Sequence, residues 1–229
     1  MSLAMTNQTE SGEFSASRSS SEILYSNLSK GLHAAAQPLT ILRAGLGMGL
    51  ASPLSLSELR ELVASSYVEI ERVCGLFDYL QQLVFVASTK PSLTAAPILP
   101  LVAGAADGVC ALFEHDGMVL SSMLPDACDP VLIDKARTFR ALSSVLLIVH
   151  GLSRAPDTVE LIVSSSPPNS IRIVVRNLNL YLDALGEEPS LSMAIAAANI
   201  RSQQADFSWN LQPFSVEIEV QTDRIAQCR

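Results

Sequence analysis

The chain of 229 residues has no long apolar run and little positive charge. No apolar run approaches the roughly 20 residues that span a bilayer. Lys and Arg number 15 against 23 Asp and Glu, a net charge of −8, so no basic patch is dense enough to bind nucleic acid or an anionic membrane. We therefore expect neither nucleic acid nor a membrane as partner. The Ser-rich N-terminus lacks the apolar core of a signal peptide, which favours a cytoplasmic location.

The cysteines show none of the spacings typical of metal or redox sites. Cys74, Cys110, Cys128 and Cys228 are far apart, with no Cys-x-x-Cys pair and no cluster of Cys with His. In a reducing compartment such cysteines are ordinary unpaired thiols. We expect no metal site and no disulfide framework.

Apolar residues dominate the chain outside its first segment. They make up 48% of the sequence against 17% charged residues, which favours a folded chain with a substantial apolar contact surface. Residues 1–20 are polar and rich in Ser, and we expect them to be flexible. The rest divides into a helical part, residues 21–89, and a mixed part, residues 90–229.

The helical part has the apolar periodicity of two long helices. The first carries an apolar seam at steps of three or four: Leu24, Leu28, Leu32, Ala35, Leu39, Leu42 and Leu46. Gly45, Gly47 and Gly49 should weaken its end, and Ser52-Pro53 supplies a break before a second seam from Leu59 to Ala87. The pattern predicts an antiparallel helical hairpin. Because a hairpin alone cannot cover both stripes, we expect a homodimer paired as a four-helix bundle.

A Pro-containing segment at the junction of the two parts, residues 89–100, is typical of a linker. Apolar patterning beyond it predicts helices over 101–112, 133–152 and 190–203, and strands over 117–120, 158–163, 170–175 and 214–220. Helices interleaved with antiparallel strands predict an α+β fold, in which one sheet packs against a helical layer.

A histidine and a proline lie close together within the first predicted helix. His33 is followed by three alanines, Gln37, Pro38, Leu39 and Thr40. Proline inside a helix removes the hydrogen bond to the carbonyl of residue 34 and costs roughly 3 kcal/mol. The position of this proline indicates a backbone shaped around the imidazole. A histidine in such a setting can serve as a nucleophile for phosphoryl transfer.

The segment from His33 to Thr40 resembles the phospho-acceptor box of the two-component histidine kinases, which read His-(Glu/Asp)-x-x-(Asn/Gln)-Pro-Leu-Thr. The resemblance covers residues 22–222 in the order of elements. It implies a dimeric hairpin followed by a histidine-kinase-ATPase-like α/β sandwich. It also implies that His33 is the phospho-acceptor, supported by Gln37, Pro38 and Thr40. Arg43, almost three helical turns after His33, would meet the acidic surface of a receiver domain.

The chain departs from this family where the family handles ATP. Ala34 stands where the family has the acid that acts as general base. Leu146 and His150 stand where it has two asparagines for Mg²⁺ and phosphates. Residues 176–180 lack the acid and glycines of its adenine loop, and residues 190–194 lack the glycines of its phosphate-binding helix start. We therefore expect no ATP binding and no cofactor.

A second family fits these losses better. Some histidine phosphotransferases of bacterial phosphorelays combine a dimeric hairpin with a degenerate kinase-like sandwich that has lost ATP binding. The resemblance implies a phosphotransferase or pseudo-histidine-kinase that passes a phosphoryl group between His33 and the aspartates of response-regulator receiver domains. The direction of transfer stays open. The alternative is a non-catalytic dimeric scaffold that regulates a kinase or a receiver by contact alone. A working ATP-dependent kinase would need a nucleotide site that the sequence does not show.

Overall fold

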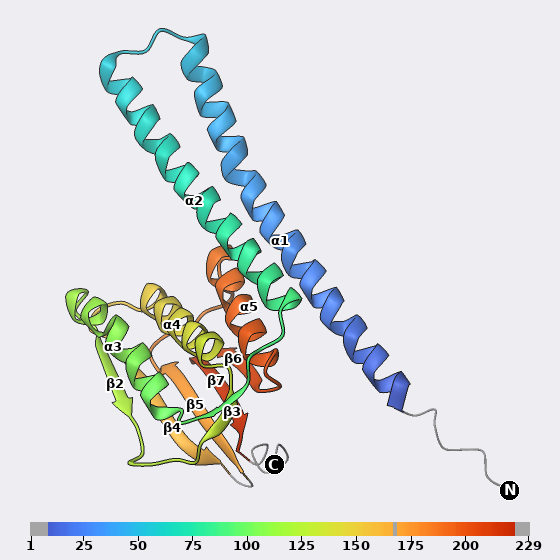
Figure 1. The fold of residues 1–229 in the computed structure, drawn as a ribbon. Helices are drawn as coiled ribbons and strands as arrows, with labels where there is room; N and C mark the ends of the chain where they lie inside the picture. The colour runs from blue at the N-terminus through green and yellow to red at the C-terminus, as the bar shows by residue number, and fades with distance from the viewer. Residues whose placement is uncertain (1–8, 167–168, 223–229) are drawn as a thin grey trace, which may run out of the picture. The chain divides into compact units, whose positions relative to one another are not determined.

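The computed structural model describes residues 9–166 and 169–222 (Figure 1). Cys228 and the first eight residues of the expected flexible N-terminus lie outside this range. The chain consists of two compact units, and the boundary between them along the chain falls between Val84 and Phe85. The boundary expected from the sequence lay at residues 89 and 90. Each unit is described on its own below.

Two long helices form the N-terminal unit. Helix α1 (Thr9–Ala51) runs through Pro38 without interruption, and helix α2 (Leu56–Ser88) follows after a short connection. Helix α1 thus begins well before residue 21, where the sequence pattern placed its start. The helical hairpin expected from the two apolar stripes is confirmed.

A capping box starts α2. The backbone N–H of Ser55 donates to Glu58 Oε2 (2.8 Å), and the Ser55 hydroxyl donates to the same oxygen (2.6 Å). The hydroxyl also accepts from the Glu58 N–H at 3.3 Å. These reciprocal bonds satisfy donors that have no partner at a helix start. The Ser55 hydroxyl, followed by its N–H, holds the pKa of Glu58 below its usual value.

The inward face of α1 is made of small residues, which corrects part of the expected seam. Gly31, Ala34, Ala35 and Pro38 are buried, and Leu28 and Leu42 are half-buried on the same face. Three further seam leucines, Leu32, Leu39 and Leu46, are between 46% and 58% exposed, and the side chain of Leu24 lies outside the described part of the chain. Leu28, Ala35 and Leu42 form one row, and Leu32, Leu39 and Leu46 form a second row four positions later. Four residues turn the helix by one revolution and about 40°, so the two rows lie on neighbouring faces.

Two of the glycines expected to weaken α1 allow α2 to pack closely against it. A Cβ at Gly45 would lie 3.5 Å from Leu62 Cδ1, and a Cβ at Gly49 would overlap Leu62 Cδ2. A Cβ at Gly47 would meet no atom within 4 Å. The helix continues past all three to Ala51 because this contact offsets their low helix propensity.

The C-terminal unit is a sandwich of one sheet and three helices. Its five strands have the order β2-β4-β5-β7-β6, and α3, α4 and α5 cover one face (Figure 1). Strands β1 and β3 form a separate antiparallel pair. The elements are β1 (Thr94–Ala96), α3 (Leu99–His115), β2 (Val119–Met123), β3 (Val131–Ile133), α4 (Lys135–Leu152), β4 (Thr158–Ser166), β5 (Ser170–Asn177), α5 (Glu187–Arg201), β6 (Asp206–Leu211) and β7 (Phe214–Gln221). The expected α+β sandwich is confirmed.

Alternation along the central strands separates the core from the outer face of the sheet. Ile173 on β5 and Ile218 on β7 pair in register and are buried under the helices. The intervening residues form ion pairs across the outer face. Arg172 Nε lies 2.7 Å from Glu217 Oε1, and Arg176 Nε lies 2.6 Å from Glu160 Oε2.

The structure contains three strands that the sequence pattern did not predict. Strand β1 lies in the segment expected to be a linker, and its three residues pair with β3. Both strands are too short to show a period-2 pattern. Strand β6 does alternate, with Phe207, Trp209 and Leu211 on one face, and this signal could have identified it.

We expect substitution of the α1 glycines to separate helix propensity from packing. Gly47→Ala should raise the free energy of unfolding by about 0.5–1 kcal/mol, because its methyl group meets open space. Gly49→Ala should gain less, because its methyl group displaces Leu62. Thermal unfolding followed by far-UV circular dichroism measures both variants. Equal gains would show that Leu62 does not pack against Gly49.

Candidate functional site

The site begins with an exposed histidine on the hairpin. His33 is exposed, whereas the next two residues, Ala34 and Ala35, are 2% and 3% exposed. Helix geometry therefore directs the imidazole away from the seam that contains Gly45 and Gly49. The imidazole is therefore accessible to solvent.

The position of the missing acid lies on the buried side of α1. Ala34 belongs to the inward face, where a carboxylate would lose its hydration. A small apolar side chain suits this position, and it leaves His33 without the adjacent base that the resemblance implies for autophosphorylation.

The other predicted site residues follow His33 along α1. Gln37 is exposed and Pro38 is buried. The Thr40 hydroxyl donates to the Ala36 carbonyl at 2.8 Å, so it serves the helix backbone one turn after the proline. Thr40 and Arg43 are exposed.

An open groove lies on α1 beyond this segment. Its lining consists of Thr40, Arg43, Ala44, Gly47, Met48 and Ala51. His33, Gln37, Thr40 and Ala44 are spaced at steps of four, three and four, so they share one face of the helix. The structure therefore places His33 and Gln37 at one end of a face that continues as a groove of small side chains, with Arg43 and Met48 at its edge.

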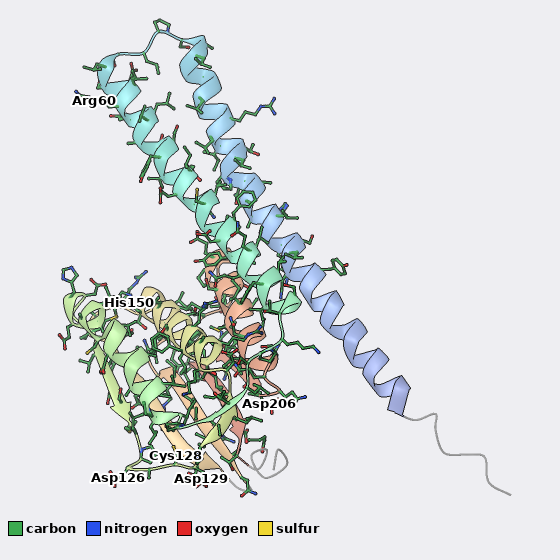
Figure 2. The ribbon with its side chains drawn as sticks, in the orientation of Figure 1. Arg60, Asp126, Cys128, Asp129, His150 and Asp206 are labelled. Atoms are coloured by element: carbon green, nitrogen blue, oxygen red, sulfur yellow. The ribbon has the colours of Figure 1, made fainter. Side chains whose placement is uncertain are left out.

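The two positions that match the nucleotide box on α4 are used internally. Leu146 has no exposed surface and belongs to the hydrophobic core of the C-terminal unit. His150 lies at the C-terminal end of α4 (Figure 2), where its Nε2 is 3.0 Å from Asp116 Oδ2. Its ring packs edge-on against Phe113, with centroids 4.9 Å apart.

The segment that stands in place of the adenine loop, residues 176–180, is also bonded within its own unit. Asn177, at the end of β5, is fully buried. Its Nδ2 donates to Ser153 Oγ at 2.8 Å and to Asp157 Oδ2 at 2.9 Å, and its Oδ1 accepts from the Asn179 N–H at 2.9 Å. These bonds use both amide hydrogens and the carbonyl oxygen. The side chain therefore closes the end of β5 onto the connection between α4 and β4.

The start of helix α5 carries an acidic side chain. The Gly186 carbonyl accepts from the Ser190 N–H at 3.0 Å, and Leu191 and Met193 are buried. Glu188 lies in the first helical turn. An acidic side chain there complements the helix dipole that would otherwise attract an anion.

Residues 9–166 and 169–222 include neither a metal-binding cluster nor a membrane-spanning helix. They contain no group of three or more His, Cys, Asp or Glu side chains able to hold a metal ion. Among the same residues, no helix combines the length and apolarity needed to cross a membrane.

The fold, though not the sequence, is similar to known proteins. No protein-family model and no curated protein sequence matches the chain. The histidine kinase AdeS of Acinetobacter baumannii has a TM-score of 0.62 at 14% identity, over 83% of this chain and 98% of AdeS. A histidine kinase of Burkholderia phymatum STM815 has a TM-score of 0.51 at 15% identity, over 84% of this chain and 97% of that one.

A third solved structure contains histidine kinase ThkA in complex with the response regulator protein TrrA. It has a TM-score of 0.68 at 11% identity, over 95% of this chain and 68% of that chain. At these identities the likeness is one of fold. The hairpin and the sandwich together have the architecture of a two-component histidine kinase.

We expect Asn177→Ala to lower the free energy of unfolding at neutral pH by about 1–3 kcal/mol, because it removes buried hydrogen bonds. The Asn177 amide, helped by the Arg154 N–H and Asn179, holds the pKa of Asp157 below its usual value. A carboxyl group whose pKa is lower in the folded state than in the unfolded state stabilises the fold at any pH above its unfolded-state pKa. This stability is lost as the pH falls through the folded-state pKa.

The cost of Asn177→Ala should therefore be greatest at neutral pH and shrink below about pH 4. Urea unfolding at a series of pH values measures it. Asn210→Ala, at the exposed turn between β6 and β7, is the matched control and should keep the wild-type pH dependence. A cost independent of pH for Asn177→Ala would contradict the coupling to Asp157.

Proposed function

We propose that the chain is a histidine phosphotransferase of a two-component phosphorelay, in which His33 exchanges a phosphoryl group with receiver-domain aspartates without ATP. One contrast carries the proposal. His33 is exposed at the end of an open helix face, whereas Leu146, His150 and Asn177 are committed to contacts inside their own unit.

The chemistry requires little from the protein. A neutral imidazole nitrogen of His33 attacks the phosphorus of a receiver aspartyl phosphate. The N–P bond forms, the bond from phosphorus to the carboxyl oxygen breaks, and the aspartate leaves as a carboxylate. The proton on the second ring nitrogen passes to solvent. The acyl phosphate is itself a reactive donor, so the absence of an acid at residue 34 is compatible with transfer in either direction.

The groove on α1 is the surface that we assign to the receiver. It continues the His33 face, and its small side chains leave room for an approaching helix. Arg43 adds a positive charge for an acidic partner. The complex of ThkA with TrrA shows a response regulator bound by a protein of this fold, which supports a receiver as the partner.

The exposed apolar stripes support a homodimer. On α2 an apolar residue recurs every seven positions and is 46–66% exposed each time. On α1 the same spacing relates Tyr25, Leu32, Leu39 and Leu46. The α2 members, called here the heptad stripe, are Leu56, Val63, Ile70, Phe77 and Val84. Seven-residue spacing is that of helices packed in a coiled coil, so we assign a second copy as the cover.

Phosphotransfer can be tested with radiolabelled receiver domains. Wild-type protein incubated with phosphorylated receivers should gain acid-labile label, and His33→Ala should gain none. His115→Ala is the matched control, since His115 is an exposed histidine at the end of α3, and should label like wild type. Mg-ATP without a receiver should give no label. Label from ATP would contradict the loss of the nucleotide site, and binding without label from any receiver would favour the scaffold alternative.

The dimer can be tested by sedimentation equilibrium. Wild type should sediment as a dimer, and Ile70→Glu with Phe77→Glu as a monomer of unchanged helix content, because two carboxylates would be buried in the interface. Val68→Glu is the matched control, because Val68 is exposed on α2 outside the heptad stripe. If the double variant remains dimeric, the dimer interface does not include the heptad stripe.

A further inference from the structure

The segment expected to be a linker is bonded to the C-terminal unit by a buried arginine. Arg137, in the first turn of α4, is 5% exposed. Its Nη2 donates to the Thr89 carbonyl at 2.8 Å and to Thr89 Oγ1 at 2.6 Å. Its Nη1 donates to Ser202 Oγ at 2.9 Å and, more weakly, to the Val86 carbonyl at 3.4 Å. The guanidinium carbon lies 6.0 Å from the centre of the Phe85 ring.

These acceptors include carbonyls at the end of α2. The last carbonyls of a helix have no intrahelical donors, and a cation beside them also complements the helix dipole. The planar guanidinium reaches several acceptors at once, which a lysine ammonium on its single flexible stem does not reproduce. Arg137 therefore acts as a cap for α2, supplied by a helix about 50 residues later in the chain.

Asp134 provides a second attachment beside Arg137. Its Oδ2 accepts from the Ser92 N–H at 2.8 Å and lies 3.7 Å from Arg137 Nε, while its Oδ1 caps α4 through the Arg137 N–H at 3.1 Å. The Asp134 backbone N–H donates to Gln203 Oε1 at 2.6 Å, so the turn after α5 holds the backbone at Asp134. Strand β1, which starts at Thr94, then pairs with β3.

We propose that Arg137 and Asp134 form a latch that fastens residues 85–92, the junction segment, to the C-terminal unit. The latch removes the freedom that a proline-containing linker would otherwise have, and it makes the last turn of α2 part of the C-terminal unit. The division between the units consequently falls at Val84 and Phe85, within a continuous helix. Opening the latch releases the junction segment while the sheet stays folded.

Hydrogen exchange of the full chain, followed by mass spectrometry, tests the latch. Arg137→Met should speed exchange in residues 86–92 by about tenfold or more, and Arg137→Lys should give part of this increase. Peptides from β4, β5 and β7 should exchange as in wild type. Arg201→Met is the matched control, because Arg201 donates to the Phe207 carbonyl in the same unit but does not touch the junction segment.

Unchanged exchange in residues 86–92 would overturn the latch. Equal acceleration in the junction segment and the sheet would also overturn it, because Arg137 would then support the whole unit. If Arg137→Met does not fold, Thr89→Val tests the same contact by removing one acceptor of the guanidinium. Thr89→Val should speed exchange in residues 86–92. Ser88→Ala is its control and should not speed exchange, because the Ser88 hydroxyl donates to the Phe85 carbonyl and does not contact Arg137. No effect of Thr89→Val would overturn the proposal.

Discussion

The close packing of small residues along α1 decides what the rest of the hairpin presents to its surroundings. Gly45 and Gly49 contact Leu62, and the buried Ala34 and Ala35 continue the same inward face. Once this face is occupied, helix geometry leaves His33 outside. Leu32, Leu39 and Leu46 of α1 also remain exposed and available to another surface. The accessible imidazole of His33 and the exposed apolar stripes therefore both follow from how this one face is packed.

The C-terminal unit keeps a kinase-like fold while its polar groups serve that fold. In a nucleotide site, polar side chains must face a cleft and remain unpaired until the ligand arrives. Here the fully buried Asn177 amide is bonded to Ser153, Asp157 and Asn179. Satisfied buried polar groups stabilise a unit, whereas empty ligand sites leave such groups exposed or unpaired. This bonding within the unit is the observation on which the proposed loss of nucleotide binding rests.

The sequence pattern predicted the larger elements because their periods are long enough to read. The hairpin, the helices α3, α4 and α5, and the strands β4, β5 and β7 all appear near their expected positions. The short strands β1 and β3 were missed, since three residues carry no period and the nearby prolines indicated a linker. Half of the α1 seam was assigned to the wrong face. Periodicity alone does not distinguish a stripe that faces the partner helix from its neighbour one position away.

Local order along the chain was enough to identify the candidate nucleophile, its proline-containing helix, the missing acid at Ala34 and the changed loops. These features depend on residue types at fixed spacings. The partners of Asn177, Arg137 and Asp134 became visible in the folded chain alone. Arg137 and Thr89 are 48 positions apart and Asp134 and Gln203 are 69 apart. Such contacts form only when elements far apart in the sequence pack together, and a local sequence pattern does not show which elements will pack.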